Sequence, residues 1–176
     1  TGTLAIGNYL ADVGGSFVGN NGTVRMYSGT TGTITSGGSS FSNLRFHGAG
    51  TFSFVDANAT VLEDITFVQG TTILPTGTLT IGGSYDNNAS VTAGTGSVVF
   101  NSTDSGETVA AGNSAFYNLT FNSLTGGWTI TEPATTTNNA SLTAVSNWTL
   151  SSGQALSVGG VFTNSVTNAS TTWTGS

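Results

Sequence analysis

The chain of 176 residues contains no cysteine and no lysine, and only 6% of its residues are charged. Without cysteine there is neither a disulfide nor thiol chemistry, so stability must come from backbone hydrogen bonds and packing. Arg25 and Arg45 are the only strong cations, and the net charge is −6. This balance argues against nucleic acid as a partner, because its phosphates need clustered Lys and Arg, and against an anionic membrane surface.

Helix-forming patterns are also missing. There are three glutamates, two prolines and no stretch with apolar residues at i, i+3 and i+4. No apolar run approaches the roughly 20 residues that a membrane helix requires, so we expect no membrane insertion. Glycine, threonine, serine and asparagine dominate instead, and these residues suit pleated strands and tight turns. The sequence therefore predicts an all-β protein.

A long internal repeat organises the chain. Residues 41–46 (FSNLRF) recur 75 positions later as residues 116–121 (FYNLTF). Residues 2–7 recur at 77–82, and residues 71–83 recur at 148–160 with an offset of 77. We expect one domain, 1–176, made of super-repeats 1–75 and 76–152 and a partial third, 153–176. A repeat of this length is typical of solenoids.

Strand-like segments follow one another every 8–12 residues or so, separated by Gly, Asn and Ser turns. Many alternate between apolar and polar residues, which predicts one buried and one solvent-facing side. The expected strands are Thr3–Ile6, Ser16–Val18, Thr23–Tyr27, Gly32–Thr35, Asn43–Phe46, Thr51–Val55, Thr60–Leu62, Ile65–Val68, Thr78–Ile81, Ser90–Thr92, Ser97–Asn101, Thr108–Ala110, Tyr117–Asn122, Trp128–Thr131, Ser141–Ala144, Trp148–Leu150, Ala155–Val158, Val161–Thr163 and Thr172–Thr174.

Two architectures fit this pattern. The favoured one is a right-handed parallel β-helix, or β-solenoid, in which the super-repeat holds three coils of about 25 residues or four of about 19. Trp128, Trp148 and Trp173 recur at a similar spacing, so we expect them to stack from coil to coil. The alternative is a string of small β-sandwiches, each of which would have a thin core.

The chain starts at Thr1 and stops within a repeat, so we expect either a piece of a longer solenoid or a subunit with bare ends. Bare solenoid ends offer unpaired strand edges. Contacts between such ends do not close, so they predict a head-to-tail homopolymer.

The motifs at residues 96–101, 115–121, 148–150 and 156–164 resemble those of repetitive, secreted β-helix proteins of bacterial cell surfaces. The resemblance covers nearly the whole chain, and its order is more specific than any single motif. It implies an extracellular or cell-surface location and an elongated, adhesin-like scaffold. It implies no catalytic residues.

One polar position recurs after a glycine-rich turn. Asn87 and Asn164 follow Gly-Gly-x-aromatic, and Asp12 falls at the corresponding place in the first copy. Their oxygens suit a Ca²⁺ ion, but an asparagine ladder that bonds turn backbone explains them better. We therefore expect a turn ladder of Asp12, Asn87 and Asn164, and no metal site.

The sequence offers no convincing catalytic set. Its eight carboxylates are scattered, and a glycosidase needs two that converge. Asp56 and Glu132 match between repeats and indicate a recurring turn. His47 is the only histidine, so neither a zinc site nor a nucleophile triad is supported. We expect no enzyme activity and no cofactor.

Eight Asn-x-Ser/Thr sequences are possible glycosylation sites if the producing cell glycosylates. They begin at Asn21, Asn58, Asn88, Asn101, Asn118, Asn139, Asn147 and Asn168. In a chain this rich in Ser and Thr, several arise by chance.

The sequence thus predicts an extracellular structural protein, a solenoid segment of a fibre, sheath or surface stalk that partners itself or adjoining repeats. The alternative is an adhesin or glycan-binding module whose side face recognises polysaccharide. A polysaccharide-active enzyme is the third hypothesis.

Overall fold

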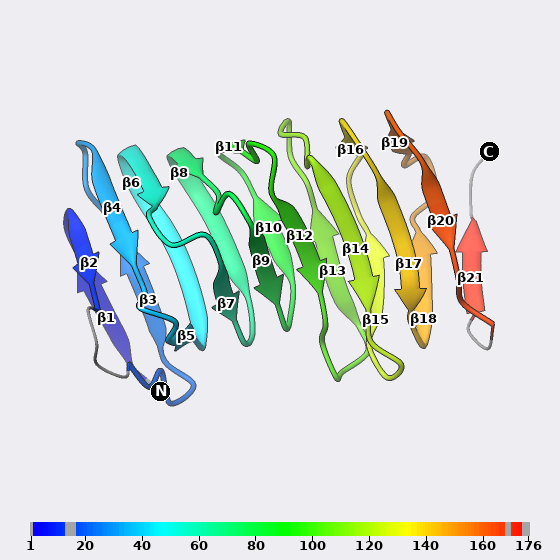
Figure 1. The fold of residues 1–176 in the computed structure, drawn as a ribbon, viewed down its shortest axis with the longest axis horizontal. Helices are drawn as coiled ribbons and strands as arrows, with labels where there is room; N and C mark the ends of the chain where they lie inside the picture. The colour runs from blue at the N-terminus through cyan, green and yellow to red at the C-terminus, as the bar shows by residue number, and fades with distance from the viewer. Residues whose placement is uncertain (1, 13–16, 168–169, 174–176) are drawn as a thin grey trace.

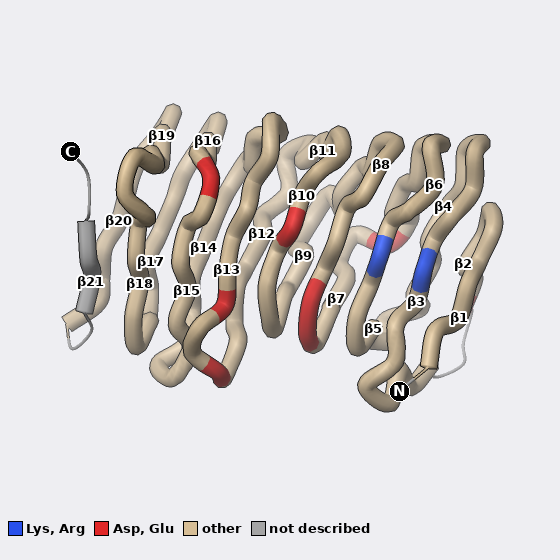
Figure 2. The backbone as a smooth tube through the Cα atoms, turned by 180° about the vertical axis from the view of Figure 1, so that it is seen from behind, with Lys and Arg blue, Asp and Glu red and all other residues tan. Residues whose placement is uncertain are grey.

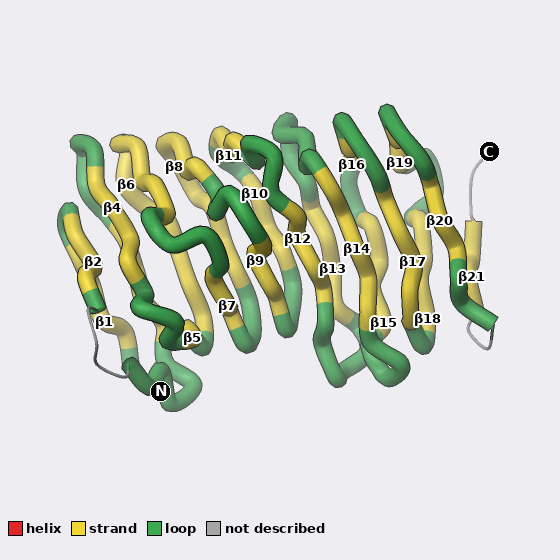
Figure 3. Tube along the Cα trace, in the orientation of Figure 1, coloured by secondary structure: helices red, strands yellow, loops and turns green. Residues whose placement is uncertain are grey.

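The computed structural model is a β-solenoid of about eight coils. It describes residues 2–12, 17–167 and 170–173. No helix occurs among these residues, and strands alternate with loops along the whole rod (Figures 1 and 3). The first and last strands lie at opposite ends of the long axis (Figure 1). The all-β prediction and the preference for a solenoid are confirmed.

Each coil contributes up to three short strands, and every pairing between named strands is parallel. The first stack of strands runs the length of the rod. It comprises β1 (Thr3–Ile6), β3 (Thr23–Met26), the first half of β6 (Asn43–Phe54), the first half of β8 (Ile65–Ile73), β10 (Tyr85–Asn87), β13 (Glu107–Ala110), β15 (Gly127–Ile130), β18 (Asn147–Leu150) and β21 (Ser170–Trp173).

Two further stacks complete the coils. The second comprises β2 (Tyr9–Ala11), β4 (Gly32–Thr35), the second halves of β6 and β8, β11 (Ser90–Thr92), β16 (Ala134–Thr136) and β19 (Leu156–Val158). The third comprises β5 (Ser40–Phe41), β7 (Ala59–Val61), β9 (Thr78–Ile81), β12 (Ser97–Phe100), β14 (Asn118–Asn122), β17 (Ala140–Ala144) and β20 (Phe162–Asn164). In the second stack, β16 and β19 form a separate two-stranded sheet, which an isolated bridge between Phe116 and Thr136 extends toward β11.

Alternating side chains explain why these segments form strands. In β9, Leu79 and Ile81 are buried, whereas Thr78 and Thr80 are half-buried on the outer side. In β14, Leu119 and Phe121 are buried in the same way. Each coil therefore sends its apolar residues into the rod and its Thr, Ser and Asn outward, as the period of two predicts.

Most expected strands are present, and most of their ends are shifted by a residue or two. The exceptions are β8, which continues five residues beyond the expected end, and β6, which joins two expected strands. Four short strands escaped the sequence pattern, namely β2, β5, β10 and β16. The strand expected over Ser16–Val18 is wrong for Phe17 and Val18, which adopt no strand, while Ser16 lies outside the described residues. The last expected strand corresponds to β21, and Thr174 lies outside the described residues.

Aromatic rings stack along the core from coil to coil. Phe46 and Phe67 are register partners on β6 and β8, with ring centroids 5.2 Å apart and planes 4° apart. Tyr85 continues the column at 5.2 Å from Phe67. It is buried, and this burial raises the pKa of its hydroxyl far above the ordinary value of 10.0. Stacking of like residues is thus the main packing device of the rod.

The tryptophan prediction is correct for one pair. Trp128 on β15 and Trp148 on β18 are register partners, and both are buried. Trp173 is paired with Leu150, and the partner of Trp148 on β21 is Thr171. Trp173 follows Trp148 by 25 residues, whereas this coil advances by 23 (171 − 148), so the third tryptophan lies two positions further along its strand.

Coil length varies little along the rod. Thr23 is the register partner of both Thr3 and Asn43, so the first two coils are equal in length. The longest step in the first stack runs from Tyr85 to Val109.

The coils do not divide the super-repeat evenly. In the first stack, three coils lead from Leu4 to Ile65, and a fourth leads on to Tyr85. The sequence offset of 75 therefore falls between three and four coils. The expectation of three or four whole coils per super-repeat is wrong.

From a residue to its copy 75 positions later, the chain completes three coils and then advances by two stacks. Residues 43–46 lie on β6 in the first stack, whereas their copies, residues 118–121, lie on β14 in the third stack. Residues 3–6 on β1 and their copies on β9 show the same change of stack. Copies of one motif therefore lie on different sides of the rod. This is possible because the strands of all three stacks share the same alternation of inward and outward side chains.

Candidate functional site

Side-chain amides join neighbouring coils at the turn before the third stack. Oδ1 of Asn118 accepts hydrogen bonds from Asn138 Nδ2 (2.9 Å) and from the backbone N–H of Asn139 (3.3 Å). Oδ1 of Asn139 in turn accepts from the backbone N–H of Val161 at 2.9 Å. One asparagine per coil thus covers a turn N–H of the next coil.

The turn before the first stack repeats this arrangement. Oδ1 of Asn43 accepts from the backbone N–H of Asp64 (3.2 Å), and Oδ1 of Asp64 accepts from the backbone N–H of Ser84 (2.9 Å). The hydroxyl of Ser84 accepts from the backbone N–H of Thr108 at 3.0 Å and donates to Glu107 at 2.6 Å. These bonds satisfy donors that the strand ladders leave unpaired at the corners.

Asp56 and Glu132 both bond backbone at turns, but at different corners of the rod. Asp56 follows β6 in the second stack, and its Oδ2 accepts from the backbone N–H and hydroxyl of Ser36. Glu132 follows β15 in the first stack, and its Oε2 accepts from the backbone N–H of Gly112 at 3.0 Å. More than three coil spacings of ~4.8 Å separate the two carboxylates, which exceeds the separation that a glycosidase uses.

The three residues of the predicted turn ladder do not share one column. Asn87 lies on β10 in the first stack, Asn164 on β20 in the third, and Asp12 follows β2 in the second. Each nevertheless bonds at a turn. Asn87 Oδ1 accepts from the backbone N–H of Ala89 (3.0 Å), Asn164 Oδ1 accepts from that of Val166 (3.0 Å), and Asp12 Oδ2 accepts from the Ser39 hydroxyl (2.8 Å).

The change of stack explains why these positions are separated. Motifs one super-repeat apart are turned to another side of the rod, so their polar residues cannot align. Asn87 and Asn164 keep the same local turn bond, to the backbone N–H two residues further on, because it depends only on neighbouring residues. Asp12 instead bonds to Ser39 on the next coil. Asn87 also donates from Nδ2 to the carbonyl of Ala111 at 2.9 Å and is buried.

The predicted glycosylation positions lie mostly on the outside of the rod. Exposed side chains are those of Asn21, Asn58, Asn88, Asn101, Asn139 and Asn147. Asn118 is half-buried, and its Nδ2 donates to Ser97 Oγ at 3.3 Å. A glycan on Asn118 would therefore replace a bond between coils. Asn168 lies outside the described residues.

The two arginines and the histidine come together on the first stack. Arg25 on β3 and Arg45 on β6 are register partners, and Arg25 Nη2 contacts His47 Nδ1. Figure 2 shows the two basic segments side by side, with most acidic segments on other coils. The sequence analysis missed this cluster. Its only signal is the spacing of the two arginines, which acquires meaning once the coil length is known.

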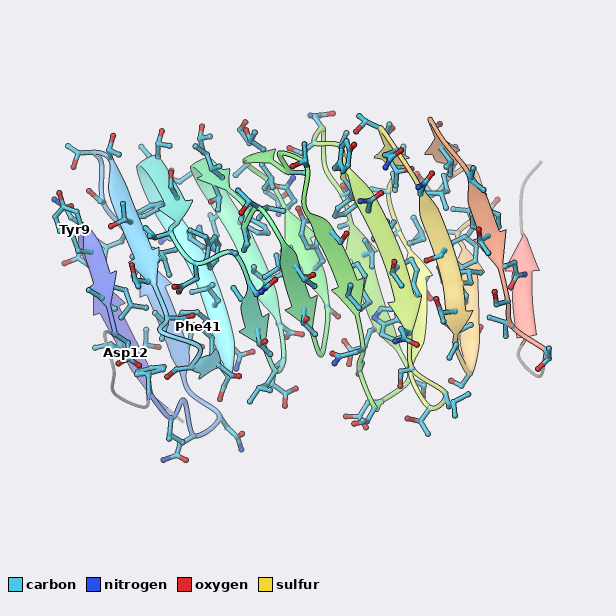
Figure 4. The ribbon with its side chains drawn as sticks, in the orientation of Figure 1. Tyr9, Asp12 and Phe41 are labelled. Carbon is cyan, nitrogen blue, oxygen red and sulfur yellow. The ribbon has the colours of Figure 1, made fainter. Side chains whose placement is uncertain are left out.

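A hollow with mainly apolar walls lies at the first coil. This cavity of about 310 Å³ is lined by Leu10, Ala11, Asp12, Phe17, Ser36, Ser39 and Phe41. Figure 4 shows Tyr9, Asp12 and Phe41 at this end of the rod. Tyr9 is 68% exposed, whereas Phe41, one coil further in, is buried.

Within residues 2–12, 17–167 and 170–173, no group of three His, Asp or Glu side chains could hold a metal ion. No helix of the described chain is long and apolar enough to span a membrane. Neither models of protein families, nor curated proteins, nor solved structures match the chain. The solenoid fold is shown by the strand pairing, whereas the resemblance to bacterial surface proteins stays a prediction.

Proposed function

We propose that the chain is a structural segment of an extracellular fibre, sheath or surface stalk, in which further coils stack on both ends of the rod. The further coils belong either to adjoining repeats of the same protein or to other copies. Low charge, a stacked aromatic core and a parallel strand ladder that runs the length of the rod support a stiff rod of this kind.

The observation that carries this proposal is an exposed apolar side chain at an inward position of the first coil. Leu4 is the register partner of Val24, and Val24 is the partner of Leu44. Val24 and Leu44 are 3% and 1% exposed, but Leu4 is 48% exposed although it occupies the same inward position. One more coil on this side would bury it, and burial of a leucine stabilises by about 2 kcal/mol.

The strand edges lead to the same proposal. Among the described residues, β1 pairs only with β3, and β21 pairs only with β18. Each end therefore presents a row of backbone donors and acceptors that can accept another parallel strand. Because all strands are parallel, such stacking is head to tail and keeps one polarity along the fibre.

Electron microscopy at several protein concentrations tests stacking between copies. We expect unbranched filaments whose length grows with concentration and whose subunit repeat is about 4 nm, from eight coils at ~4.8 Å each. The Leu4→Glu variant should give single short rods, because a carboxylate at the stacking surface cannot be buried without a partner.

Leu124→Glu is the matched control. Leu124 is 82% exposed in a side turn, so the same charge there should leave the filaments intact. Single rods for the wild type at every concentration, with no difference between the wild type and Leu4→Glu, would contradict stacking between copies.

A further inference from the structure

We infer that Arg25, Arg45 and His47 form a binding site for the sulfate or carboxylate group of an acidic polysaccharide. The inference goes beyond the proposed structural role and does not depend on end-to-end stacking. It rests on how the only strong cations of the chain are placed.

The two guanidinium groups leave the same side of the same stack. Arg25 and Arg45 are register partners on adjacent parallel strands, so their Cα atoms are about 4.8 Å apart. The residues on either side of each arginine are buried, namely Val24, Met26, Leu44 and Phe46. Both arginines therefore point outward, with Arg45 exposed and Arg25 half-buried.

This pair of like charges has no carboxylate partner among the described residues. Neither arginine forms an ion pair there, and Arg25 Nε is buried without a hydrogen-bond partner. The register partner of Arg45 on the next coil is Thr66, and Asp86 follows one coil later, about 10 Å away. Asp64, at the corner beside them, accepts a bond from Ser84 on the following coil.

Like charges on adjacent strands repel each other. The chain has eight carboxylates, but in the part that the structure describes none of them is paired with the two adjacent arginines. The arginines therefore carry a local positive charge that an external anion can neutralise. Paired guanidinium groups are well suited to this, because they present N–H donors in a fixed plane to the oxygens of sulfate or carboxylate.

His47 completes the donor set. Because arginine can only donate, His47 Nδ1 accepts the bond from Arg25 Nη2. The neutral imidazole then carries its proton on Nε2, which can donate to an oxyanion. The contact also fixes the position of the Arg25 side chain. The three side chains line a surface hollow of about 370 Å³ together with Thr3 and Thr23, and no acidic residue lines it.

The surroundings favour a sugar polymer over a free ion. Tyr27 is 49% exposed, and the Arg25 guanidinium carbon lies 5.8 Å from the centroid of its ring. An exposed aromatic ring beside paired cations can contact a sugar ring while the arginines bind its charged group. The remaining surface is net negative and repels polyanions, so binding of a polyanion must be local.

Binding to four probes tests this inference: dextran sulfate, polygalacturonate, neutral dextran and sodium sulfate. We expect dextran sulfate, polygalacturonate or both to bind, and to weaken as salt rises. Comparison of these two polymers distinguishes a sulfate from a carboxylate ligand. Neutral dextran should not bind, and sodium sulfate should compete with the polymer only weakly.

The double variant Arg25→Gln/Arg45→Gln should weaken polymer binding by at least about tenfold, because two charge-assisted contacts are lost. Its net charge is −8, two units below the wild-type −6. Ser157→Glu/Thr163→Glu reaches the same net charge at exposed positions of the last complete coil and should keep wild-type affinity apart from a small general repulsion.

Arg45→Gln alone gives a second test that does not depend on the Arg25–His47 contact, since Arg45 is exposed. Arg45→Lys should retain more affinity than Arg45→Gln, because it keeps the charge. The inference is overturned if neither polyanion binds, if neutral dextran binds equally well, if sodium sulfate binds as tightly as the polymers, or if the Arg25→Gln/Arg45→Gln variant binds like its charge-matched control.

Discussion

Phe100 and Phe121 stack face to face in the core, with ring centroids 5.0 Å apart and planes 12° apart, although they belong to successive coils of the chain. They are register partners on β12 and β14. Phe46 and Phe67 show the same relationship earlier in the rod. The rod is therefore held together by like residues placed one coil apart, and each ring is fixed by the coils on both sides of it.

Replacement of Phe121 should be far more damaging than replacement of its neighbour on the strand. Phe121→Ala should lower the free energy of unfolding by about 3–5 kcal/mol, because it leaves a cavity among the stacked rings. Phe121→Asp should prevent folding, since its charge would enter the core without a partner. Urea unfolding followed by circular dichroism measures both effects.

Thr120→Ala is the matched control on the outer side of β14. Its hydroxyl only shares a 3.0 Å hydrogen bond with Ser141, so the loss should be about 1 kcal/mol. If Phe121→Asp unfolded like the wild type, the inward direction of this strand would be wrong.

The strands and the fold class could be predicted because alternation is a local property. Leu119 and Phe121 reveal their buried side from the neighbouring residues alone, and the predicted direction is correct. The long repeat then excludes most other all-β architectures. Strands such as β10, with the sequence Tyr-Asp-Asn, were missed because their polar residues resemble a turn and their pairing comes from strands on other coils.

The coil length was expected only as about 19 or about 25 residues, and the stack on which each motif falls and the site could not be predicted, because they depend on how the chain closes on itself. The strongest sequence period is 75, but a coil is much shorter, since Thr3 already pairs with Thr23. The copies Asn43 and Asn118 therefore lie in different stacks. The same reason separates Asn87 from Asn164. Arg25 and Arg45 lie side by side because they are one coil apart, and two single residues in a sequence do not reveal the length of a coil.

Deletion of one residue should be tolerated in a loop that already varies in length. The step from Tyr85 to Val109 is the longest in the first stack, and exposed residues at 103–106 occupy part of the excess. Deletion of Thr103 should lower the melting temperature by only a few degrees, since a ΔΔG of about 1 kcal/mol shifts it by roughly 2–4 °C at this size.

Deletion of Thr120 should instead prevent folding, so that no cooperative thermal transition is observed. It would turn Phe121 and the rest of β14 to the opposite side, since strand side chains alternate. Differential scanning calorimetry of both deletions distinguishes the cases. Equal melting temperatures would contradict the assignment of residues 118–122 as a strand with one buried side.

Loss of the Asn118 side chain should measure how much the amides between coils contribute. Asn118→Ala removes the acceptor for Asn138 Nδ2 and for the backbone N–H of Asn139. We expect the free energy of unfolding to fall by about 1–3 kcal/mol, because these donors lose their partner at a half-buried corner.

Asn122→Ala on the same strand is the control. Asn122 is exposed, so the free energy of unfolding should change by no more than about 0.5 kcal/mol. Hydrogen exchange of the Asn139 amide provides a second measurement and should become faster only in Asn118→Ala. Equal stability and equal exchange in the two variants would show that the side-chain bonds between coils contribute little.

The buried Tyr85 should make the rod less stable in strong alkali. Burial raises the pKa of its hydroxyl above the ordinary value of 10.0, and unfolding returns it to that value. Below pH 10 both states keep the proton, so this group gives no pH dependence. Above pH 10 the unfolded chain releases the proton and the folded chain retains it, so stability falls by up to about 1.4 kcal/mol per pH unit.

Tyr85→Phe should remove this contribution while keeping the ring that packs on Phe67 and Phe116. Urea unfolding of both proteins at half-unit steps from pH 9 to 11 measures the difference. The wild type should lose stability relative to Tyr85→Phe only above about pH 10, the ordinary tyrosine value. Parallel curves over the whole range would mean that the Tyr85 hydroxyl ionises as readily in the rod as in the unfolded chain, and that it reaches solvent.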